Sequence, residues 1–410
     1  MSARHERRAP TRTSYDVVIV GGAIYGSAVA WFLSDDPDFD GRVLVVERDP
    51  SYELASTSHT NSCMRQQFSN EINVRVSQFA AEFVKDFPAR LGGEPRVPEI
   101  LFRSHGYLYL AADEAFARTL REAQRLQARC GAGTRTMTPD EILRDYPFIN
   151  VEDIVAGNLN TVDEGWFDGA ALFDGWRRSA RERGVEYVAG EVVSMTRNPA
   201  GTRVQSVTLA TGERIACGTV VNASGPRAAR TAAMAGIELP VEPRKRYSFV
   251  FSAEAPLARS LPLTIDPSGV HVRSEGPEGG ATYLAGCPPE EDPAVEPDDF
   301  VADHALWEEK VWPALAHRVP RFEAIRLESS WVGHYAYNVF DRNAVLGRHT
   351  RVENFLFVNG FSGHGLQQSP AMGRGTAELI VHGEYRTLDL SPFDYARIPA
   401  GKPFVERAVI

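Results

Sequence analysis

The residues whose types and spacing could bind a phosphate lie close to the N-terminus. Gly21, Ala23 and Gly26 occupy the three glycine positions of a G-x-G-x-x-G pattern, with alanine in place of the middle glycine. Glycines at a strand-to-helix turn let the backbone approach a pyrophosphate, which the first N–H groups of the helix then bind. Glu47 follows at about the twenty-residue distance from which an acid accepts hydrogen bonds from a ribose. The spacing predicts a dinucleotide site.

Two strands and a helix must position these residues. Val17 to Val20 and Val43 to Val46 are apolar, β-branched runs of the kind found in buried parallel strands. Between them, apolar residues recur at helical spacing, namely Ile24, Ala28, Trp31 and Phe32. The pattern predicts a βαβ unit.

A transmembrane helix is the alternative for this stretch, because residues 17–33 contain no charged residue. The run is short for a bilayer, two adjacent glycines interrupt it, and Ser34-Asp35-Asp36 follows without a basic flank. We therefore expect no transmembrane segment.

A second strand, glycine-rich turn and helix are predicted near the C-terminus, in residues 355–380 with the turn at 360–365. This helix would also present free N–H groups to a negatively polarised group. A third apolar strand, residues 217–225, runs into the small-residue turn Asn222-Ala-Ser-Gly-Pro and could lay backbone against a cofactor. Because similar sites lie at both ends of the chain, we expect both ends to belong to one domain, with strand-rich sections inserted.

Further elements are predicted between these sites. Helices are expected at 71–90, 114–130, 166–183 and 300–315, and a further helix is expected to begin after a Thr138 cap. Strands are expected at 102–112, 185–193 and 329–337. Residues 204–209 and 213–216 are expected to form a hairpin, and residues 240–285 a mainly antiparallel sheet.

Composition narrows the class of protein. The chain has 410 residues and a net charge of −10, which argues against nucleic acid or an anionic membrane as the main partner. Its four cysteines are far apart and form no C-x-x-C pair, so neither a disulfide framework nor a metal site is predicted. These features favour a reduced, cytoplasmic location. Residues 1–14 are basic and polar, and we expect a disordered tail there.

Three motifs together resemble the FAD-dependent D-amino-acid oxidase superfamily, which includes sarcosine oxidases and the sarcosine and dimethylglycine dehydrogenases. The motifs are DVVIVGGAIYGSAVA, VVNASG and NGFSGHGLQQSPAMGRGTAELI. Longer segments, among them RQQFSNEINVRVSQF and TVDEGWFD, resemble the subfamily called FAD-dependent oxidoreductase domain-containing protein 1. The resemblance covers nearly everything after Tyr15.

This resemblance implies an α/β (α+β) fold. A Rossmann-like, glutathione-reductase-type FAD-binding domain would carry an inserted mixed, largely antiparallel β-sheet substrate domain. The expected FAD-binding segments are 15–95, 155–235 and 338–395; the substrate segments are 96–154 and 236–337; tails are expected at 1–14 and 396–410.

The resemblance also assigns residues to FAD. They are Gly21, Gly22, Ala23, Ile24, Gly26, Glu47, Arg48, Ser56, Thr57, His59, Ser62, Val193, Ala223, Ser224, Gly225, Gly363, His364, Gly365, Leu366 and Gln367. The backbone of Val193 would meet the adenine, and the N–H groups of 363–367 would lie over the pyrimidine end of the isoalloxazine, where they can stabilise negative charge.

Attachment of FAD is expected to be non-covalent. The region where the family carries an attachment cysteine corresponds to Gly333-His334, which has none. The alternative is His59, since Ser56-Thr-Ser-His59 is similar to the segment through which dimethylglycine dehydrogenases attach FAD by histidine.

The expected catalytic residues are Arg65, Tyr335, Gln367, His364 and Tyr247. Arg65 falls where sarcosine oxidases carry an arginine that grips the substrate carboxylate; the alternative is an arginine paired with a surface acid. Gln367 replaces a family lysine, which would weaken carboxylate binding or admit a different substrate. Tyr335 and Tyr247 would form walls of the pocket, or belong to ordinary core.

The function that follows is oxidation of a secondary or tertiary amine, such as an N-methyl amino acid, by hydride transfer to flavin N5. A D-amino acid is an alternative substrate, and an assembly role, as in a eukaryotic branch associated with a respiratory complex, is an alternative function. Oxygen, a quinone or an electron-transfer protein would accept the electrons; Leu284, at the place of an oxygen-activating lysine, favours a dehydrogenase. Gly360-Phe-Ser-Gly-His is not the G-x-S-x-G of a serine hydrolase, and an NAD(P) enzyme would have no use for this turn.

Overall fold

The N-terminal βαβ unit forms as predicted in the computed structural model, which describes residues 9–407. Strand β1 (Ser14–Val20) leads into helix α1 (Ile24–Asp35) and then strand β2 (Val43–Glu47). The two strands are parallel, with Val17 opposite Val43 and Val20 opposite Val46. Their alternate side chains enter two different cores, one on each face of the sheet. Burial on both faces explains the continuous apolar runs in the sequence.

Strand β1 lies in the middle of the first sheet, whose order is β10-β11-β12-β1-β2-β9, with β19 beside β12 and β18 beside β19. The further strands are β9 (Glu186–Ala189), β10 (Val192–Arg197), β11 (Val204–Leu209), β12 (Arg214–Asn222), β18 (Val345–Arg348) and β19 (Phe355–Asn359). Strands β1, β12 and β19 run parallel, with Val221 of β12 opposite Ile19 and Leu356. Both ends of the chain therefore share one sheet, and the predicted hairpin of β11 and β12 is confirmed.

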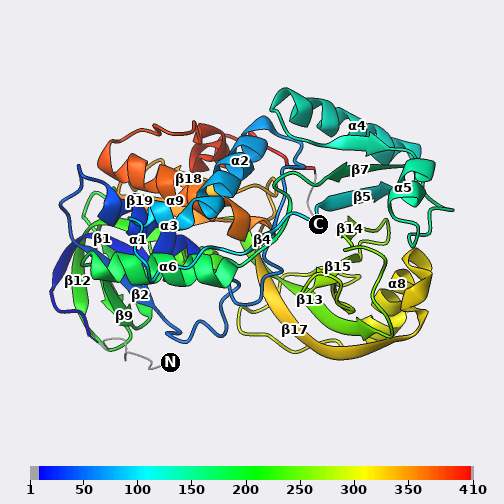
Figure 1. Ribbon diagram of the computed structural model, residues 1–410. Helices are drawn as coiled ribbons and strands as arrows, with labels where there is room; N and C mark the ends of the chain where they lie inside the picture. Colours follow the sequence, from blue (N-terminus) through cyan, green and yellow to red (C-terminus); the bar gives the residue numbers. More distant parts are fainter. Residues whose placement is uncertain (1–8, 408–410) are drawn as a thin grey trace.

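Helices cover one face of this sheet (Figure 1). They are α1, α2 (Glu71–Lys85), α3 (Phe87–Arg90), α6 (Gly169–Glu182) and α9 (Gly365–Val381). Helix α1 packs against α6 and α9, and its Trp31 and Phe32 form a ring cluster with Phe83 and Trp176. The expected helix 71–90 is divided at Asp86, and the expected helix 166–183 begins at Gly169, because Asp168 caps it and residues 165–167 form a strand.

The second sheet has the order β17-β13-β16-β15-β14-β5-β7-β6. Its strands are β5 (Tyr107–Ala111), β6 (Arg135–Met137), β7 (Ala156–Asn160), β13 (Val241–Ala253), β14 (Leu263–Ile265), β15 (His271–Glu275), β16 (Thr282–Cys287) and β17 (Ile325–Asn338). All neighbours are antiparallel except β14 and β5. One expected boundary is corrected: β7 lies in the segment 155–235 assigned to the FAD-binding domain, yet it pairs within this sheet.

Helices also pack against the second sheet. They are α4 (Glu114–Arg129), α5 (Pro139–Asp145), the π-helix Trp307–Val311 and α8 (Trp312–Arg318). The predicted Thr138 cap is present, with Glu141 completing a capping box. The expected helix 300–315 begins late, at Trp307, whose ring packs on Phe249 and Phe251 of β13. Helix α7 (Ala228–Ala233) and 3₁₀ turns at 225–227, 320–323, 391–393 and 395–397 complete the described elements.

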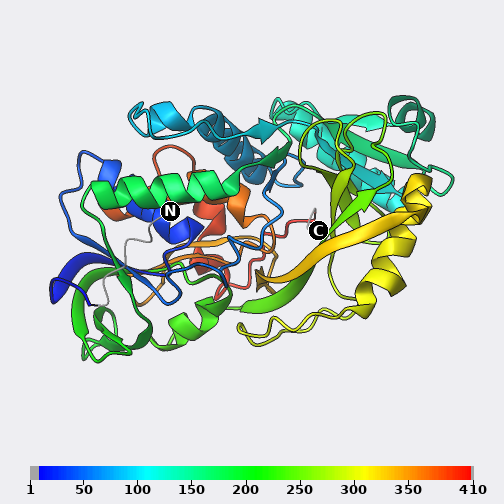
Figure 2. The ribbon, with the colours of Figure 1, turned by 60° about the horizontal axis from the view of Figure 1, so that its bottom comes forward.

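The two sheets form lobes that lie side by side, joined by the long strands β13 and β17 (Figures 1 and 2). A small third sheet of β3 (Cys63–Met64), β8 (Gly165–Phe167) and β4 (Phe102–Arg103) brings residues 63–68 next to residues 160–167. Asp298 adds ion pairs across the lobes, to Arg48 at 3.0 Å and to Arg227.

The two expected tails are corrected where they are described. Thr11 donates from its N and Oγ1 to Glu186, at 2.7 and 2.6 Å, so residues just before β1 are held in place. Near the other end, Glu406 is fully buried against Ser69 and Asn73. Residues 1–8 and 408–410 of these tails lie outside the described residues.

Within residues 9–407, no helix is both long enough and apolar enough to cross a bilayer.

Candidate active site

A cavity of about 400 Å³ lies between the two sheets. On one side it is lined by residues at or just beyond the carboxyl ends of β1, β2, β12 and β19, and on the other by residues of β13, β15 and β17. The carboxyl ends of parallel strands form the usual ligand crevice of such sheets. The cavity therefore joins a nucleotide-binding edge to the face of the second sheet.

Two helices begin at this cavity. Residues Ala23 and Ile24 of α1 and His364 and Gly365 of α9 all line it. Neither helix has a side-chain cap or an acidic residue in its first turn. The positive ends of two helix dipoles therefore face one space, which suits a ligand with phosphates at one end and an electron-rich group at the other.

Gly21 makes the turn after β1 possible. Its φ is +96°, and a Cβ at this position would lie 2.5 Å from the carbonyl oxygen of Ala223, in the turn after β12. A Cβ on Gly26 would lie 1.8 Å from the carbonyl oxygen of Gly21. Gly26 and Gly22 do not line the cavity; Gly22 donates its N–H to Glu47 at 2.7 Å, and Gly26 lets α1 pack on the turn.

Almost all residues predicted for FAD line the cavity. They are Gly21, Ala23, Ile24, Glu47, Arg48, Ser56, Thr57, His59, Ser62, Ala223, Ser224, Gly225, Gly363, His364, Gly365, Leu366 and Gln367. Val193 does not line the cavity, but Val192, the residue before it and the first of β10, does. The expected contact between the Val193 backbone and the adenine stays a prediction.

Arg65 lies on the wall of the cavity and is only 3% exposed. Its guanidinium lies 3.9 Å from the centroid of the Phe68 ring, and its Nη1 donates to the carbonyl oxygen of Gln67. Its backbone N–H donates to Oε1 of Gln367 at 2.7 Å, which ties the first turn of α9 to this residue. The alternative of a surface arginine is therefore wrong.

Tyr247 and Tyr335 line the cavity from the second sheet. The guanidinium of Arg246 lies 4.5 Å from the centroid of the Tyr335 ring, and Asp292 binds that guanidinium with both oxygens, at 2.8 and 2.9 Å. Burial raises the pKa of Tyr335, so its hydroxyl stays protonated. The wall is thus aromatic with a charge-compensated arginine behind it.

Sequence reasoning missed a polar group on the same wall, formed by Asn61, Ser248 and His271. Ser248 Oγ donates to Oδ1 of Asn61 at 3.0 Å, and Nδ2 of Asn61 lies 2.9 Å from Nε2 of His271. These residues belong to a loop and to antiparallel strands, and no motif in the sequence connects them. Only the register of the folded sheet brings them together.

Two histidines of the cavity are neutral. Burial, with the nearby charges of Arg273 and Arg246, lowers the pKa of His271 to about 4. Burial and Arg65 lower the pKa of His364 to about 3. Neither ring nitrogen of His364 has a hydrogen-bond partner among the described residues. Buried polar atoms are normally paired, so these nitrogens could form hydrogen bonds with a bound ligand.

His59, the alternative attachment residue, lies on the cavity with its ring against Phe300 at 5.6 Å between centroids. Its Nδ1 lies 3.1 Å from the carbonyl oxygen of Ala55 and donates a hydrogen bond to it. Leu284 is buried on β16 and does not line the cavity, so its identity carries no argument about reaction with oxygen.

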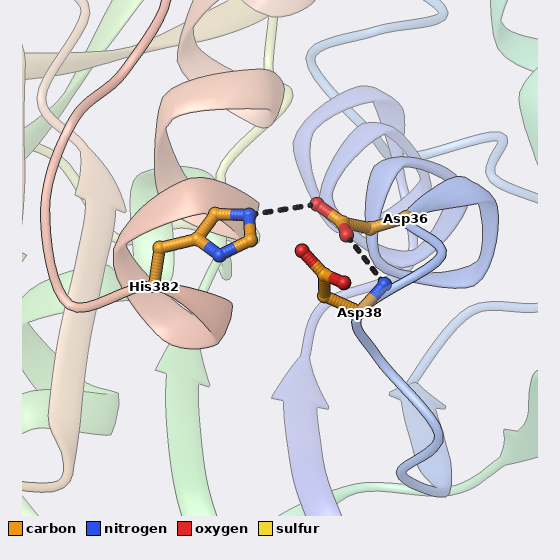
Figure 3. Close-up of side chains that lie close together, drawn as sticks. All are labelled: Asp36, Asp38 and His382. Carbon is orange, nitrogen blue, oxygen red and sulfur yellow. Dashed lines mark hydrogen bonds and ion pairs between the residues drawn. The ribbon is translucent and has the colours of Figure 1, made fainter.

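Outside the cavity, Asp36, Asp38 and His382 lie close enough to share a cation (Figure 3). Nε2 of His382 lies 3.2 Å from Oδ2 of Asp36, and the other Asp36 oxygen accepts from the N–H of Asp38 at 3.0 Å. These contacts tie the end of α1 to the end of α9 and need no ion.

A family model described as "FAD dependent oxidoreductase" matches residues 16–379. The chain is 38% identical to FAD-dependent oxidoreductase domain-containing protein 1 of Xenopus laevis, over 96% of this chain and 85% of that protein. It is 22% identical to sarcosine oxidase subunit beta of Rhodobacter capsulatus, over 90% of this chain and 85% of that protein.

Among solved structures, L-proline dehydrogenase from P. horikoshii is similar with a TM-score of 0.81 and 25% identity, over 97% of this chain and 100% of that one. Glycine oxidase from Geobacillus kaustophilus has a TM-score of 0.77 at 22% identity, over 93% of this chain and 98% of that one. The predicted two-part fold is confirmed.

A buried acid near Arg65 generates a prediction about pH. Burial raises the pKa of Glu164 from 4.5 to about 7, although Gln67, Gln66, Asn160 and Arg65 act to lower it. As pH rises from 4.5 to 7, the unfolded chain loses this proton and the folded chain keeps it, so the group's contribution to stability falls, by about 3 kcal/mol.

Glu164→Gln removes this titration. We expect the free energy of unfolding of the wild type, minus that of the variant, to fall by about 3 kcal/mol between pH 4 and pH 8, as measured by urea unfolding at both values. An equal difference at the two pH values would show that Glu164 titrates normally.

Proposed function

Because this chain belongs to the FAD-dependent oxidoreductase family, we propose that it oxidises the C–N bond of a secondary or tertiary amine, with N-methyl and other N-substituted amino acids as its substrates. The observation that carries this proposal is the buried Arg65 on the wall of a cavity that also contains the expected flavin turn, Gly363 to Gln367. An open cavity lined by both Arg65 and this turn supports catalysis more than an assembly role.

FAD fits the residues present. Gly21 to Ile24 and Glu47 would hold its ADP half, Ala223 to Gly225 its later turn, and Gly363 to Gln367 its isoalloxazine, beside the unpartnered nitrogens of His364. When bound, FAD supplies a hydride acceptor at N5. We assign the first sheet and its helices to FAD and the second sheet to the substrate.

Arg65 is the proposed ligand of the substrate carboxylate. A guanidinium binds a carboxylate with two parallel hydrogen bonds, and such charge-assisted bonds are worth about 1.5–3 kcal/mol. Gln367 does not replace Arg65 in this role, since its Oε1 already accepts from the backbone N–H of Arg65. The neutral amide instead holds Arg65 in register with the first turn of α9.

The charges around the cavity favour a neutral amine. Arg65 and Arg246 contribute to the lowered pKa values of His364 and His271, and the same positive field lowers the pKa of an amine bound nearby. An amine must be unprotonated before its α-carbon or N-methyl carbon gives up a hydride, because the nitrogen lone pair stabilises the cation that forms. Arg65 would thus favour the neutral form of the amine as well as bind its carboxylate.

Tyr247 and Tyr335 would complete the site by holding the substrate and excluding water. Hydride transfer needs the reacting atoms about 3–3.5 Å apart and aligned, and rigid aromatic walls limit other arrangements. The resulting imine would then hydrolyse to the smaller amine and a carbonyl compound. Oxygen, a quinone or an electron-transfer protein remains open as the final acceptor.

Substitution of Arg65 tests the proposal. With the most active member of a panel of N-methyl and cyclic amino acids, Arg65→Gln is expected to lower kcat/KM about 10- to 150-fold, the loss of one charge-assisted pair. For Arg65→Lys, which keeps the charge, we expect a kcat/KM between that of the wild type and that of Arg65→Gln. Rates come from anaerobic bleaching of the flavin band.

Arg90→Gln is the matched control, because its guanidinium also lies over a ring, that of Phe83, but outside the cavity. Wild-type kcat/KM in Arg65→Gln protein that retains FAD would contradict carboxylate recognition by Arg65.

Acid precipitation tests how FAD is held. We expect the yellow colour to remain in the supernatant, because Nδ1 of His59 is engaged with Ala55 and the attachment cysteine of the family is absent. Colour that stays in the precipitate of the wild type and leaves it in His59→Ala would show a covalent link.

A further inference from the structure

The loop from Arg65 to Asn70 connects β3 to α2 and carries Arg65 on the cavity wall. It has no regular secondary structure, so its backbone groups need partners elsewhere. Two fully buried carboxylates from distant parts of the chain, Glu164 and Glu406, provide them. The loop is therefore fixed from outside rather than by its own turns.

Glu164 holds the part of the loop next to Arg65. Its carboxylate accepts from the N–H of Gln66 at 2.6 Å, from Nε2 of Gln67 at 3.0 Å and from Nδ2 of Asn160 at 2.9 Å. Nε2 of Gln67 also donates to the carbonyl oxygen of Tyr107 at 3.0 Å, and the carbonyl oxygen of Gln67 accepts from Nη1 of Arg65. One residue thus separates the carboxylate from the guanidinium.

Glu406 holds the far part of the loop. It accepts from the N–H and the hydroxyl of Ser69, at 2.8 and 2.6 Å, and from Nδ2 of Asn70 and of Asn73, at 3.1 and 2.8 Å. Glu406 thereby anchors the end of the loop next to α2, and Glu164 fixes the end next to Arg65.

Glu164 lies in the turn between β7 and β8, and the backbone of this turn is strained. Asp163 has a φ of +55°, a costly conformation for a residue with a side chain. Gly165 has a φ of +143°, and a Cβ there would lie 2.1 Å from the carbonyl oxygen of Arg103. The backbone carbonyl of Glu164 accepts from the N–H of Gly106 at 2.9 Å. Lys85 pairs with Asp163 at 2.8 Å on the outside.

Stability alone does not account for Glu164. A buried carboxylate commonly stabilises a fold no more than an apolar side chain of similar size. Glu164 does not line the cavity, so it cannot touch the substrate either. Two of its three hydrogen bonds come from Gln66 and Gln67, so they order the two residues that follow Arg65.

We propose that Glu164 is a positioning residue for substrate binding, which holds the backbone of Gln66 and Gln67 so that Arg65 meets a carboxylate in one fixed geometry. This inference rests on the proposed function of Arg65. A guanidinium that is already oriented loses less freedom when a ligand binds, so its affinity for carboxylates is higher.

Glu164→Gln tests the inference because it keeps the size of the side chain and removes an acceptor. The new amide nitrogen is itself a donor and faces other donors, so a hydrogen bond to the loop is lost and the loop becomes less ordered. In FAD-loaded protein, we expect the Kd for benzoate, measured from the change in the flavin spectrum, to rise about tenfold, with the Kd for neutral benzamide little changed. In turnover, KM should rise and kcat should hold.

Glu378→Gln is the matched control, since Glu378 is also buried and accepts backbone N–H groups, of Arg386 and Thr387, but lies away from the cavity. It should leave both Kd values unchanged. Glu164→Asp keeps the charge on a shorter side chain and is expected to weaken benzoate binding several-fold, which provides a second test if the glutamine variant does not fold.

Failure of the positioning role and failure of the proposed function give different results. A benzoate Kd that rises in Arg65→Gln but is of wild-type size in Glu164→Gln or Glu164→Asp would overturn the positioning role alone. A benzoate Kd that is insensitive to Arg65→Gln, or no binding of benzoate to the wild type, would overturn the proposed function and this inference with it. Equal weakening of benzoate and benzamide in Glu164→Gln would also overturn it, as a general structural effect.

Discussion

The contact between the turn after β1 and the turn after β12 is the constraint on which the rest of the structure depends. Only glycine at position 21, with its positive φ and no side chain, lets these turns meet. Because β12 also pairs with β19, the same contact aligns the two ends of the chain in one sheet. The first turns of α1 and α9 then face one cavity, and the long strands β13 and β17 bring the second sheet across it. In the proposed function, binding of the cofactor and binding of the substrate would both follow from this one packing arrangement.

The distribution of charge explains how such a cavity could process amines. Positive charge comes from Arg65 and from two helix N-termini, while Arg246 is offset by Asp292. The lowered pKa of His364 is a consequence of burial and of Arg65, and it leaves a neutral ring at the start of α9. Glu164, whose pKa burial raises to about 7, lies one layer behind the cavity wall and accepts hydrogen bonds from the loop that carries Arg65. An arrangement of this kind attracts a carboxylate and disfavours an ammonium ion in the same small space.

The elements with local signals could be predicted from the sequence, and the residues placed by long-range pairing could not. The strands around Gly21 and the helix after His364 follow from hydrophobic runs and glycine turns, and the Thr138 cap from its own capping box. The start of the helix expected at 166–183 was placed too early, because Asp168 caps the helix and residues 165–167 form a strand. His271, Asn61 and Glu164 reach the site region through sheet register and a strained turn between β7 and β8, which composition and spacing do not reveal. Long-range hydrogen bonds also hold the described parts of the expected tails: Thr11 donates to Glu186, and Glu406 accepts from Ser69.

In the proposed function, the cavity selects an amine by its carboxylate and oxidises it with the bound flavin. The most direct measurement is stopped-flow mixing of the FAD-loaded wild type, without oxygen, with N-methylglycine and with N-methylglycinamide at equal concentrations of the free amine. We expect the acid to bleach the flavin at least about tenfold faster than the amide, because only the acid forms the charge-assisted pair with Arg65. Equal rates for the two compounds, or bleaching by the amide alone, would contradict it.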